Sequence, residues 1–304
     1  MPASRVLIVG AGRAGVTLAV ALAAAGVDVQ LVARRAQRRD EVTAWLRRQG
    51  LAIAVLPEPV AAPVIVLAVP DRALAAAAHA LAAADGAGQQ TQWLHLSGAA
   101  PWQVLQVPGA TQELAAMHPL AALPDPLDLD SAAAAVRPLR GATFAVAGTP
   151  AAQATAAELV ALLGGHVVAV ADGARPLYHA AAALAANDLV ALLQVAEQAA
   201  IAAGLTPAQA RAGLGHLMQT ALDAIRRLPD DAPLRLGLTG AVARGDAATV
   251  ARHLQALNQH HPPTALLHCL LSAELVELMR DSALGPAALA ALDTVLAQVP
   301  RPGE

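Results

Sequence analysis

The chain has 304 residues, a formal net charge of −3 and 2% aromatic residues. This length favours two domains, and the absence of a basic tract argues against a nucleic-acid partner. A single cysteine, Cys269, excludes an internal disulfide. The first strand starts too near Met1 for a signal peptide, and no Leu-, Ile- or Phe-rich stretch reaches the ~20 residues of a membrane span. We therefore expect a cytoplasmic protein.

All 20 basic residues are arginine, and the chain contains no lysine. No lysine can therefore act as a general acid or form a Schiff base. The Tyr-x-x-x-Lys pair of short-chain dehydrogenases is excluded too, because Ala182 stands where Tyr178 would need its lysine. A catalytic proton has to come from histidine, tyrosine, an acid, serine or water.

The chain opens with an apolar strand over residues 5–10, a glycine turn and a helical stretch over residues 16–26. The glycines stand in G-x-G-x-x-G register, which gives a tight turn, backbone access to a pyrophosphate and close helix packing. The helix N-terminus adds free N–H groups for phosphate. We predict dinucleotide binding rather than an ordinary βα turn. The binding residues expected in this turn are Gly10, Gly12, Arg13, Ala14 and Gly15.

The second strand, residues 28–35, ends without the acidic residue that accepts the ribose hydroxyl of NAD. Arg34 and Arg35 stand there instead, with Arg38 and Arg39 close behind. A guanidinium group suits a phosphate, so we predict NADP(H), with Arg34 as the first phosphate ligand and Arg35 as the second. FAD is less favoured, and the alternative is that these arginines form the solvated start of a helix.

The rest of the first half continues to alternate strands and helices. Helices are expected near residues 73–84 and 150–163, and residues 122–131 form a loop rich in proline and aspartate. We predict an α/β fold, a doubly wound parallel Rossmann sheet. The further strands are expected at residues 51–56, 64–69, 92–98, 143–148 and 166–170.

No strand pattern follows Gly173. A helix over residues 175–204 would be about 45 Å long, and an apolar helix of this length usually buries a face against a partner. We therefore predict an NADP-binding Rossmann domain over residues 1–171 and an all-helical domain over residues 172–304 that forms a homodimer. Its other helices are expected near residues 206–228, 247–257, 263–279 and 286–299.

This layout resembles the 6-phosphogluconate-dehydrogenase-like superfamily, in which a Rossmann domain precedes a helical domain. Residues 64–71, VIVLAVPD, look like the strand that ends beside the nicotinamide, which adds Val69 and Pro70 to the expected cofactor site. More narrowly, the chain resembles a bacterial Rossmann-like family whose C-terminal half is a domain of unknown function. The matching motifs are HLSGA at 95–99, MHPL at 117–120, LYHAAAALAAN at 177–187 and LTGAVARGDAATVARHL at 238–254.

The resemblance also sets expectations for the chemistry. Some relatives are implicated as ketopantoate reductases, so a ketopantoate-type 2-oxo acid is the favoured substrate. The family usually has proline where this chain has Ala241. The wider superfamily often uses a lysine near the position of Ala183, so that mechanism does not carry over.

Polar residues near the carboxyl ends of the strands are the candidates for catalysis. Ser97 could bind a substrate carboxylate or the nicotinamide amide, or it could cap a turn. His95, on the same strand, is expected to be a hydrogen-bonded core histidine. His118-Pro119 resembles the histidine-proline turn of prephenate dehydrogenases, and an imidazole with a pKa near neutrality suits proton delivery. The alternative is a histidine that braces a proline loop.

His179, Ala183 and Asn187 share one stripe of the long helix. We interpret Asn187 as a substrate orienter and His179 as an alternative general acid, or both as ties between the domains. Arg244 could clamp a substrate carboxylate, although a brace to Asp246, which would cap the next helix, is slightly favoured. The histidines show no spacing typical of metal ligands, so we predict no metal.

These features favour an NADPH-dependent reductase that acts on the C=O or C=N carbon of a small carboxylic acid. The candidate catalytic residues are Ser97, His118, His179 and Asn187, and the candidate substrate ligands are Ser97, Asn187 and Arg244. The second hypothesis is an NADP(H)-binding sensor or scaffold without turnover, which the missing lysine keeps open.

Overall fold

The computed structural model describes residues 5–83, 91–109 and 112–299. The chain divides into two compact units, residues 1–186 and 187–304. The first unit therefore takes in the start of the long helix α6 (Arg175–Ala202), beyond residue 171, at which the sequence analysis ends the Rossmann domain.

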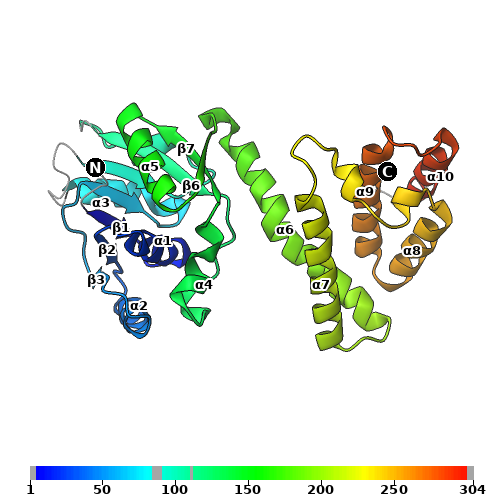
Figure 1. Cartoon of the computed structure of the whole chain (residues 1–304), viewed down its shortest axis with the longest axis horizontal. Helices are drawn as coiled ribbons and strands as arrows, with labels where there is room; N and C mark the ends of the chain where they lie inside the picture. The colour runs from blue at the N-terminus through cyan, green and yellow to red at the C-terminus, as the bar shows by residue number, and fades with distance from the viewer. Residues whose placement is uncertain (1–4, 84–90, 110–111, 300–304) are drawn as a thin grey trace. The chain divides into compact units, whose positions relative to one another are not determined.

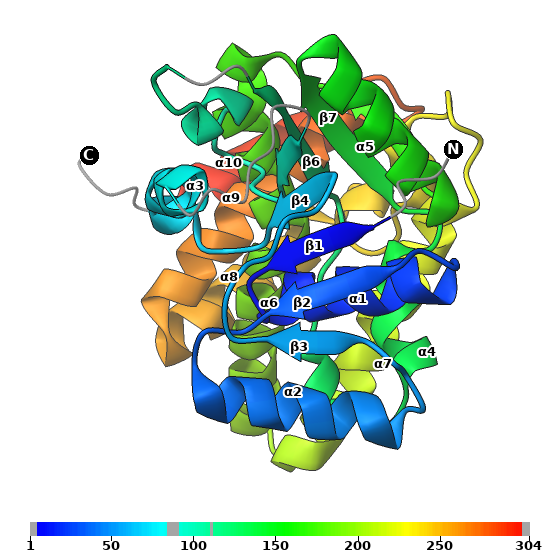
Figure 2. The same ribbon diagram turned by 90° about the vertical axis from the view of Figure 1, so that its left-hand side faces the viewer.

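The described part of the first unit holds an eight-stranded sheet in the order β3-β2-β1-β4-β5-β6-β7-β8. Figure 2 shows β3, β2, β1 and β4 side by side. This order, with helices on the sheet, confirms the predicted fold class. The strands are β1 (Val6–Val9), β2 (Val29–Val32), β3 (Ala54–Leu56), β4 (Val64–Leu67), β5 (Gln92–His95), β6 (Glu113–Pro119), β7 (Thr143–Gly148) and β8 (His166–Ala169).

Strand β6 is the main addition to the predicted sheet. The sequence analysis does not identify it as a strand, yet its residues Leu114 to Met117 are buried. It lies parallel to β5, whereas β7 lies antiparallel to it, with His118 opposite Ala145. The sheet is therefore parallel except at the β6–β7 pair. The carboxyl ends of β1, β4, β5 and β6 consequently share one edge.

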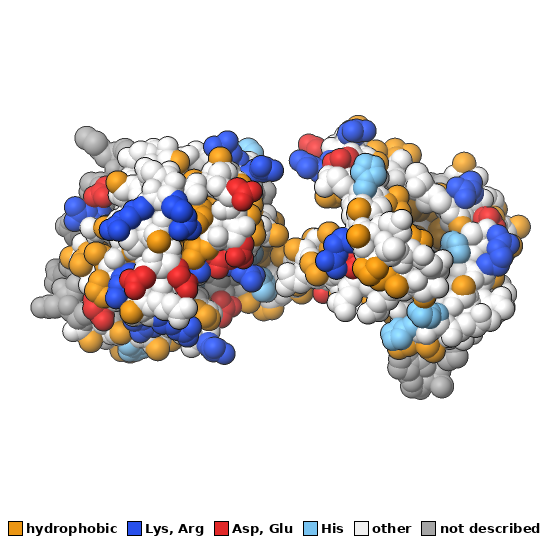
Figure 3. Space-filling view, turned by 90° about the horizontal axis from the view of Figure 1, so that it is seen from below, with side chains coloured by type: hydrophobic (Ala, Val, Ile, Leu, Met, Phe, Trp, Pro, Cys, Tyr) orange, Lys and Arg blue, Asp and Glu red, His pale blue; other side chains and the backbone are white. Residues whose placement is uncertain are grey.

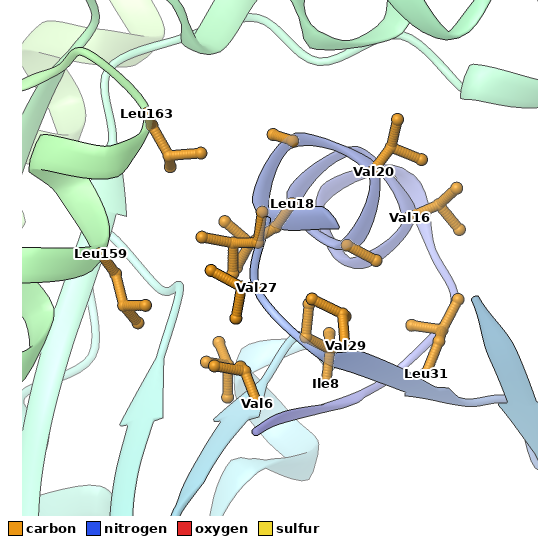
Figure 4. Close-up of a cluster of buried hydrophobic side chains, with 14 of the residues drawn as sticks. Val6, Ile8, Val16, Leu18, Val20, Val27, Val29, Leu31, Leu159 and Leu163 are labelled. Carbon is orange, nitrogen blue, oxygen red and sulfur yellow. The ribbon is translucent and has the colours of Figure 1, made fainter. Parts of the chain in front are cut away.

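Alternate residues of β1 bury opposite faces of the sheet, because side chains alternate along a strand. Val6 and Ile8 pack with α1 in one core, which Figure 4 shows, whereas Leu7 and Val9 join a second core with α3. Both faces are covered, as a parallel sheet requires. The helices of this unit are α1 (Arg13–Ala24), α2 (Ala36–Arg48), α3 (Leu74–Ala83), α4 (Ala132–Val136) and α5 (Pro150–Leu162), with short helices η1 (Asp71–Ala73), η2 (Trp102–Leu105), η3 (Pro126–Asp128), η4 (Arg137–Leu139) and η5 (Asp172–Ala174).

The helical stretches of the sequence mostly correspond to these helices. Ala84, with which the sequence analysis ends the third helix, lies outside the described residues.

The second unit is helical throughout its described residues. Helices α8, α9 and α10 share one buried core, which contains Leu254, Cys269 and Leu292, and Figure 1 shows them grouped together. The elements of this unit that follow α6 are α7 (Pro207–Arg226), η6 (Leu234–Gly237), η7 (Val242–Arg244), α8 (Ala247–His260), α9 (Pro262–Met279) and α10 (Pro286–Leu296).

Helices α6 and α7 are much less buried than the other elements. Among their residues only Arg175 of α6 and Ala210 of α7 are buried. Figure 3 shows hydrophobic side chains on the surface of the second unit. In the described residues, one helix (Asp172–Ala202) is long and apolar enough to cross a membrane, which is weak evidence by itself. The cytoplasmic location stays a prediction.

Candidate functional site

The glycine turn after β1 has the backbone that its sequence predicts. Gly10 has φ +118°, a left-handed conformation that favours glycine, and a Cβ there would clash with the carbonyl of Ala68. A Cβ on Gly15 would clash with the carbonyl of Gly10. Gly12 differs, because a Cβ there would meet nothing within 4 Å. Packing therefore explains Gly10 and Gly15, whereas Gly12 leaves open space above the turn.

That open space belongs to a hollow of about 800 Å³ at the carboxyl ends of β1, β2 and β4. It lies where the order of the strands reverses between β1 and β4, which is the usual ligand crevice of an open α/β sheet. Helix α1 begins at Arg13, inside this crevice, and its first N–H groups suit an anion. The hollow is lined by Val9–Arg13, Val32–Arg38, Glu41, Ala68–Pro70 and Asp125.

The arginines after β2 fall into two groups. Arg34 and Arg35 are exposed and line the hollow, and their side chains form no hydrogen bond or ion pair with any described residue. Arg38 is already engaged, because its Nε donates to the carbonyl of Ala11 at 2.9 Å and its Nη2 donates to both carboxylate oxygens of Asp125 at 2.9 Å. Arg34 and Arg35 are thus available to a ligand, whereas Arg38 braces the glycine turn.

Asp125 is a site residue that the sequence analysis does not identify. It comes from the proline-rich loop, caps η3 through the N–H of Leu127, and pairs with Arg38 across 87 positions of the sequence. Although partial burial opposes ionisation, the hydrogen bond from Arg38 holds the pKa of Asp125 below its ordinary value. The only sequence signal was an aspartate in a loop, which does not specify a partner.

A second group of polar residues lies at the same edge of the sheet, after β4 and β5. The Ser97 hydroxyl donates to Asp71 at 2.8 Å and accepts from the N–H of Ala100 at 2.9 Å. The bond from Ala100 makes Ser97 a turn cap, which was the alternative to a role in ligand binding. Asp71 directly follows Pro70, which lines the hollow. The serine group is therefore joined to the wall of the hollow through one hydrogen bond.

His95 is the buried, hydrogen-bonded core histidine that the sequence predicts. Its Nδ1 accepts from the N–H of Ser97 at 3.1 Å, and its Nε2 lies 3.3 Å from the carbonyl of Pro101. Burial is the main cause that lowers its pKa, to about 4. His95 is thus neutral at physiological pH and supports the turn that carries Ser97.

His118 and His179 lie next to each other. His118 is on β6, His179 is on α6, and their ring centroids are 5.7 Å apart. Gly98 lies against both rings: a Cβ there would stand 2.9 Å from Cε1 and Nε2 of His118 and would clash with His179. The structure therefore brings together the Ser97 turn, His118 and His179 from separate strands and a helix.

Burial and the neighbouring His179 and Arg175 lower the pKa of His118 to about 4. The near-neutral pKa expected for proton delivery is therefore wrong for the free protein, because the imidazole loses hydration and the neighbouring His179 and Arg175 also oppose its charge. Without a bound anion, His118 acts as a neutral imidazole.

Two further residues of this cluster, Tyr178 and Arg175, were missed by the sequence analysis. The Tyr178 hydroxyl lies 2.9 Å from Nδ1 of His118. Arg175 is fully buried, and its Nη2 donates to the carbonyl of Ser97 at 2.7 Å, while its Nε and Nη1 have no partner. Burial lowers the pKa of Arg175. Both residues precede the recognised helix stripe; Tyr178 lies in the motif at 177–187 and is the single tyrosine of the chain, whereas Arg175 had no signal of its own.

The remaining predicted residues belong to the second unit. Asn187 is its first residue, and Arg244 ends η7. Asp246 caps α8 as expected, by accepting from the N–H of Thr249 at 2.9 Å. Among the described residues no hydrogen bond or ion pair joins the Arg244 side chain to Asp246, whose carboxylate accepts from the Thr249 hydroxyl at 2.6 Å. Hydrogen bonds from Thr249 and, less strongly, the nearby Arg244 charge lower the pKa of Asp246, so the brace between Arg244 and Asp246 stays a prediction. Arg244 is exposed, and its role in binding stays a prediction.

No group of three or more possible metal ligands occurs within the described residues.

The fold and the glycine turn define a class of proteins with a Rossmann-type domain followed by a helical domain. A family model for a Rossmann-like domain matches residues 2–122. A second model, for a domain of unknown function, DUF2520, matches residues 142–274. The chain therefore contains a region that matches a Rossmann-like domain, followed by a region that matches the domain of unknown function, in the order that its motifs indicate.

Solved structures of similar fold match residues of both units. A provisionally assigned NADP oxidoreductase from Bacteroides fragilis has a TM-score of 0.68 at 18% identity, over 91% of this chain and 99% of that chain. Protein TM1727 from Thermotoga maritima has a TM-score of 0.67 at 19% identity, over 90% of this chain and 97% of that chain. A pyrroline-5-carboxylate reductase from Coxiella burnetii gives 0.60 at 14% identity, over 98% of each chain. At these identities the likeness establishes the fold alone. No curated protein sequence matches this chain.

Proposed function

We propose that this protein is an NADP(H)-dependent oxidoreductase that reduces the C=O or C=N bond of a small carboxylic acid, with a ketopantoate-type 2-oxo acid as the favoured substrate. The observation that carries the proposal is the continuity between the hollow and the histidine cluster. Pro70 lines the hollow, and Asp71 bonds the turn whose Gly98 touches both His118 and His179. When bound, the nicotinamide would supply a hydride.

The cofactor preference rests on Arg34 and Arg35. Both side chains line the hollow without an internal partner, and a phosphate on the adenosine ribose would supply one. Gly12 adds support, because its missing Cβ serves no packing contact and leaves the backbone open to a pyrophosphate. Carboxylates also line the hollow, but Asp125 is held by Arg38. The residues present therefore fit a phosphorylated dinucleotide.

Titration calorimetry of Arg34→Ala tests the preference. A hydrogen bond between charged groups contributes about 1.5–3 kcal/mol, so NADPH should bind roughly 10- to 100-fold more weakly, while NADH binding stays constant. Arg48→Ala is the matched control, because Arg48 is exposed on α2 and does not line the hollow. Tighter binding of NADH than of NADPH by the unaltered protein would contradict the preference.

The chemical roles rest on the histidine cluster. His118 would donate a hydrogen bond to the substrate oxygen or nitrogen, His179 is the alternative donor, and Asn187 would orient the substrate. Ser97 and Arg244 are the candidates for its carboxylate. An anionic substrate would also raise the pKa of His118, because an opposite charge favours the imidazolium.

Steady-state NADPH oxidation against a panel of 2-oxo acids and cyclic imines tests the reaction. His118→Ala and His179→Ala then identify the donor: a general acid contributes typically 10²- to 10⁴-fold, so one variant should lose most turnover with NADPH affinity intact. If NADPH binds and no member of a broad panel is reduced, the protein is an NADP(H)-binding sensor or scaffold instead.

We also propose a homodimer through the helical unit. Val190 of α6 is 68% exposed and Leu217 of α7 is 62% exposed, so both helices carry apolar surface that this chain leaves uncovered. A second copy would supply a matching face in a symmetric interface. Light scattering after size-exclusion chromatography should give twice the mass of 30.6 kDa. A monomer at micromolar concentration would contradict the proposal.

A further inference from the structure

Tyr178, in the first turn of α6, makes a directed contact that the proposed function leaves unused. Its hydroxyl lies 2.9 Å from Nδ1 of His118, which is 60 positions away in the sequence. The two rings meet edge to face, with centroids 5.6 Å apart and planes at 87°. The hydroxyl therefore addresses only one of the two ring nitrogens.

The protonation states of this pair decide which atom donates. Burial raises the pKa of Tyr178, so the hydroxyl keeps its proton. Burial and the neighbouring His179 and Arg175 lower the pKa of His118 to about 4, so the imidazole is neutral. A neutral imidazole has one donor nitrogen and one acceptor nitrogen. Nδ1 is the one acceptor that the described residues offer to the Tyr178 O–H. The tautomer with an unprotonated Nδ1 therefore uses this proton in a hydrogen bond, whereas the other tautomer leaves it without an acceptor among those residues.

In the first of these tautomers the second ring nitrogen, Nε2, carries the proton of the imidazole. It forms no hydrogen bond with a described residue, and it is not among the buried polar atoms that lack a partner, so solvent reaches it. Gly98 keeps this edge of the ring clear, since a Cβ there would stand 2.9 Å from Nε2. The free N–H therefore remains available to a ligand.

The charged groups around His118 do not offer another partner for Nδ1. His179 and Arg175 face it from α6, Asp71 faces it from η1, and His95 faces it from β5. Asp71 is the acid among them, and its carboxylate accepts the hydroxyl of Ser97. Tyr178 is thus the group that orients the imidazole.

We propose that Tyr178 is a positioning residue that fixes His118 in the Nε2–H tautomer, so that the ring presents an N–H donor to the carbonyl oxygen or imine nitrogen of the substrate. The role in reduction rests on the proposed function, whereas the tautomer does not. A chain without lysine thereby obtains an oriented donor from two residues of different elements.

Nitrogen NMR of the full chain labelled with ¹⁵N-histidine tests the tautomer directly. The His118 signals are assigned by their loss in His118→Gln. We expect a protonated Nε2 and an unprotonated, hydrogen-bonded Nδ1 at neutral pH. In Tyr178→Phe the Nδ1 signal should shift and a population with protonated Nδ1 should appear, because the phenyl ring cannot donate. Leu177→Ala is the matched control, since this neighbour is 77% exposed.

Kinetics test the consequence of the tautomer. Tyr178→Phe should lower kcat by roughly 10-fold or more, with KM and NADPH affinity little changed, because the donor is misdirected rather than the site lost. A protonated Nδ1 in the unaltered protein, or an unchanged ¹⁵N pattern in Tyr178→Phe, would overturn the proposal. If no substrate is reduced, the NMR result still decides the tautomer. Failure of the proposed function is therefore distinguishable from failure of the proposed role of Tyr178.

Discussion

The sheet unit and the helix pair α6–α7 bury their apolar residues very differently. Strands β1 and β4 are buried along their whole length, with both faces covered. Helices α6 and α7, which are also rich in apolar residues, bury one residue each. Hydrophobic composition alone therefore does not produce a core. A core forms where the topology places a second apolar surface within the same chain.

The comparison can be tested most strongly in the sheet unit. Trp93 of β5 is fully buried in the core shared with α3. Trp93→Ala removes a large side chain from a site that cannot collapse completely, so it should cost about 3–5 kcal/mol of unfolding free energy. Denaturant unfolding of the full chain measures this. A loss below about 1 kcal/mol would mean that the strand tolerates a cavity.

The pH dependence of stability provides the next largest effect. His95 has a pKa of about 4 in the folded chain, against about 6.5 when unfolded. Between these values the unfolded state binds the extra proton, so stability is fully present above pH 6.5 and is lost as the pH falls toward 4. The loss between pH 7 and pH 5 should be about 2 kcal/mol from this residue.

The control for the pH prediction is His95→Gln, measured by denaturant unfolding at both pH values. Its stability should fall less steeply with pH, although His118, whose pKa is also about 4, keeps part of the slope. Arg175, Asp71 and His118 surround His95 and are unchanged in the variant. Equal slopes for variant and unaltered protein would contradict the prediction.

Local contacts should matter more where burial is small. Thr206 begins α7 with a capping box, in which its side chain accepts from the N–H of Gln209 and the Gln209 side chain accepts from the N–H of Thr206. Thr206→Ala should cost about 1 kcal/mol of helix stability, and Thr206→Ser should retain most of it. Hydrogen exchange of the α7 amides measures the effect. Unchanged exchange in Thr206→Ala would show that packing, rather than the cap, holds the helix end.

The smallest effect is expected on the uncovered face of α7. Leu217 is 62% exposed, so Leu217→Ala should change the stability of the isolated chain by no more than about 0.5 kcal/mol. In a dimer the same substitution should lower the melting temperature at high protein concentration and weaken association, because partner binding adds to stability. Unfolding at two concentrations distinguishes these cases. A large effect independent of concentration would place Leu217 within the core of its own chain.

Much of the glycine turn and of the hollow beside it could be predicted because their requirements are local. Gly10 and Gly15 are needed by the backbone of one turn, and Arg34 and Arg35 follow the next strand directly. The ion pair of Arg38 with Asp125 could not be predicted, because it joins positions far apart in the sequence. The same reason applies to Tyr178 and His118, whose contact exists only once α6 begins beside the end of β6.

Strand β6 shows a related limit. Its direction relative to β7 depends on which strand pairs with it, and the apolar pattern of neither segment specifies that partner. The pairing nevertheless sets the place of His118, since it brings the end of β6 to the same edge as the turn after β5. The sequence pattern identified the residue, and the sheet supplied its neighbours.

The sequence by itself determined most of the order of the elements, the glycine turn after β1 and the chemistry that a chain without lysine can use, because these depend on residue type and short spacing. Only the tertiary structure decided which arginines remain free, which serine and histidines are already hydrogen-bonded, and which helix faces stay uncovered. Those properties depend on atoms that strand pairing and helix packing bring within a few ångströms, and their sequence separations carry no local signal.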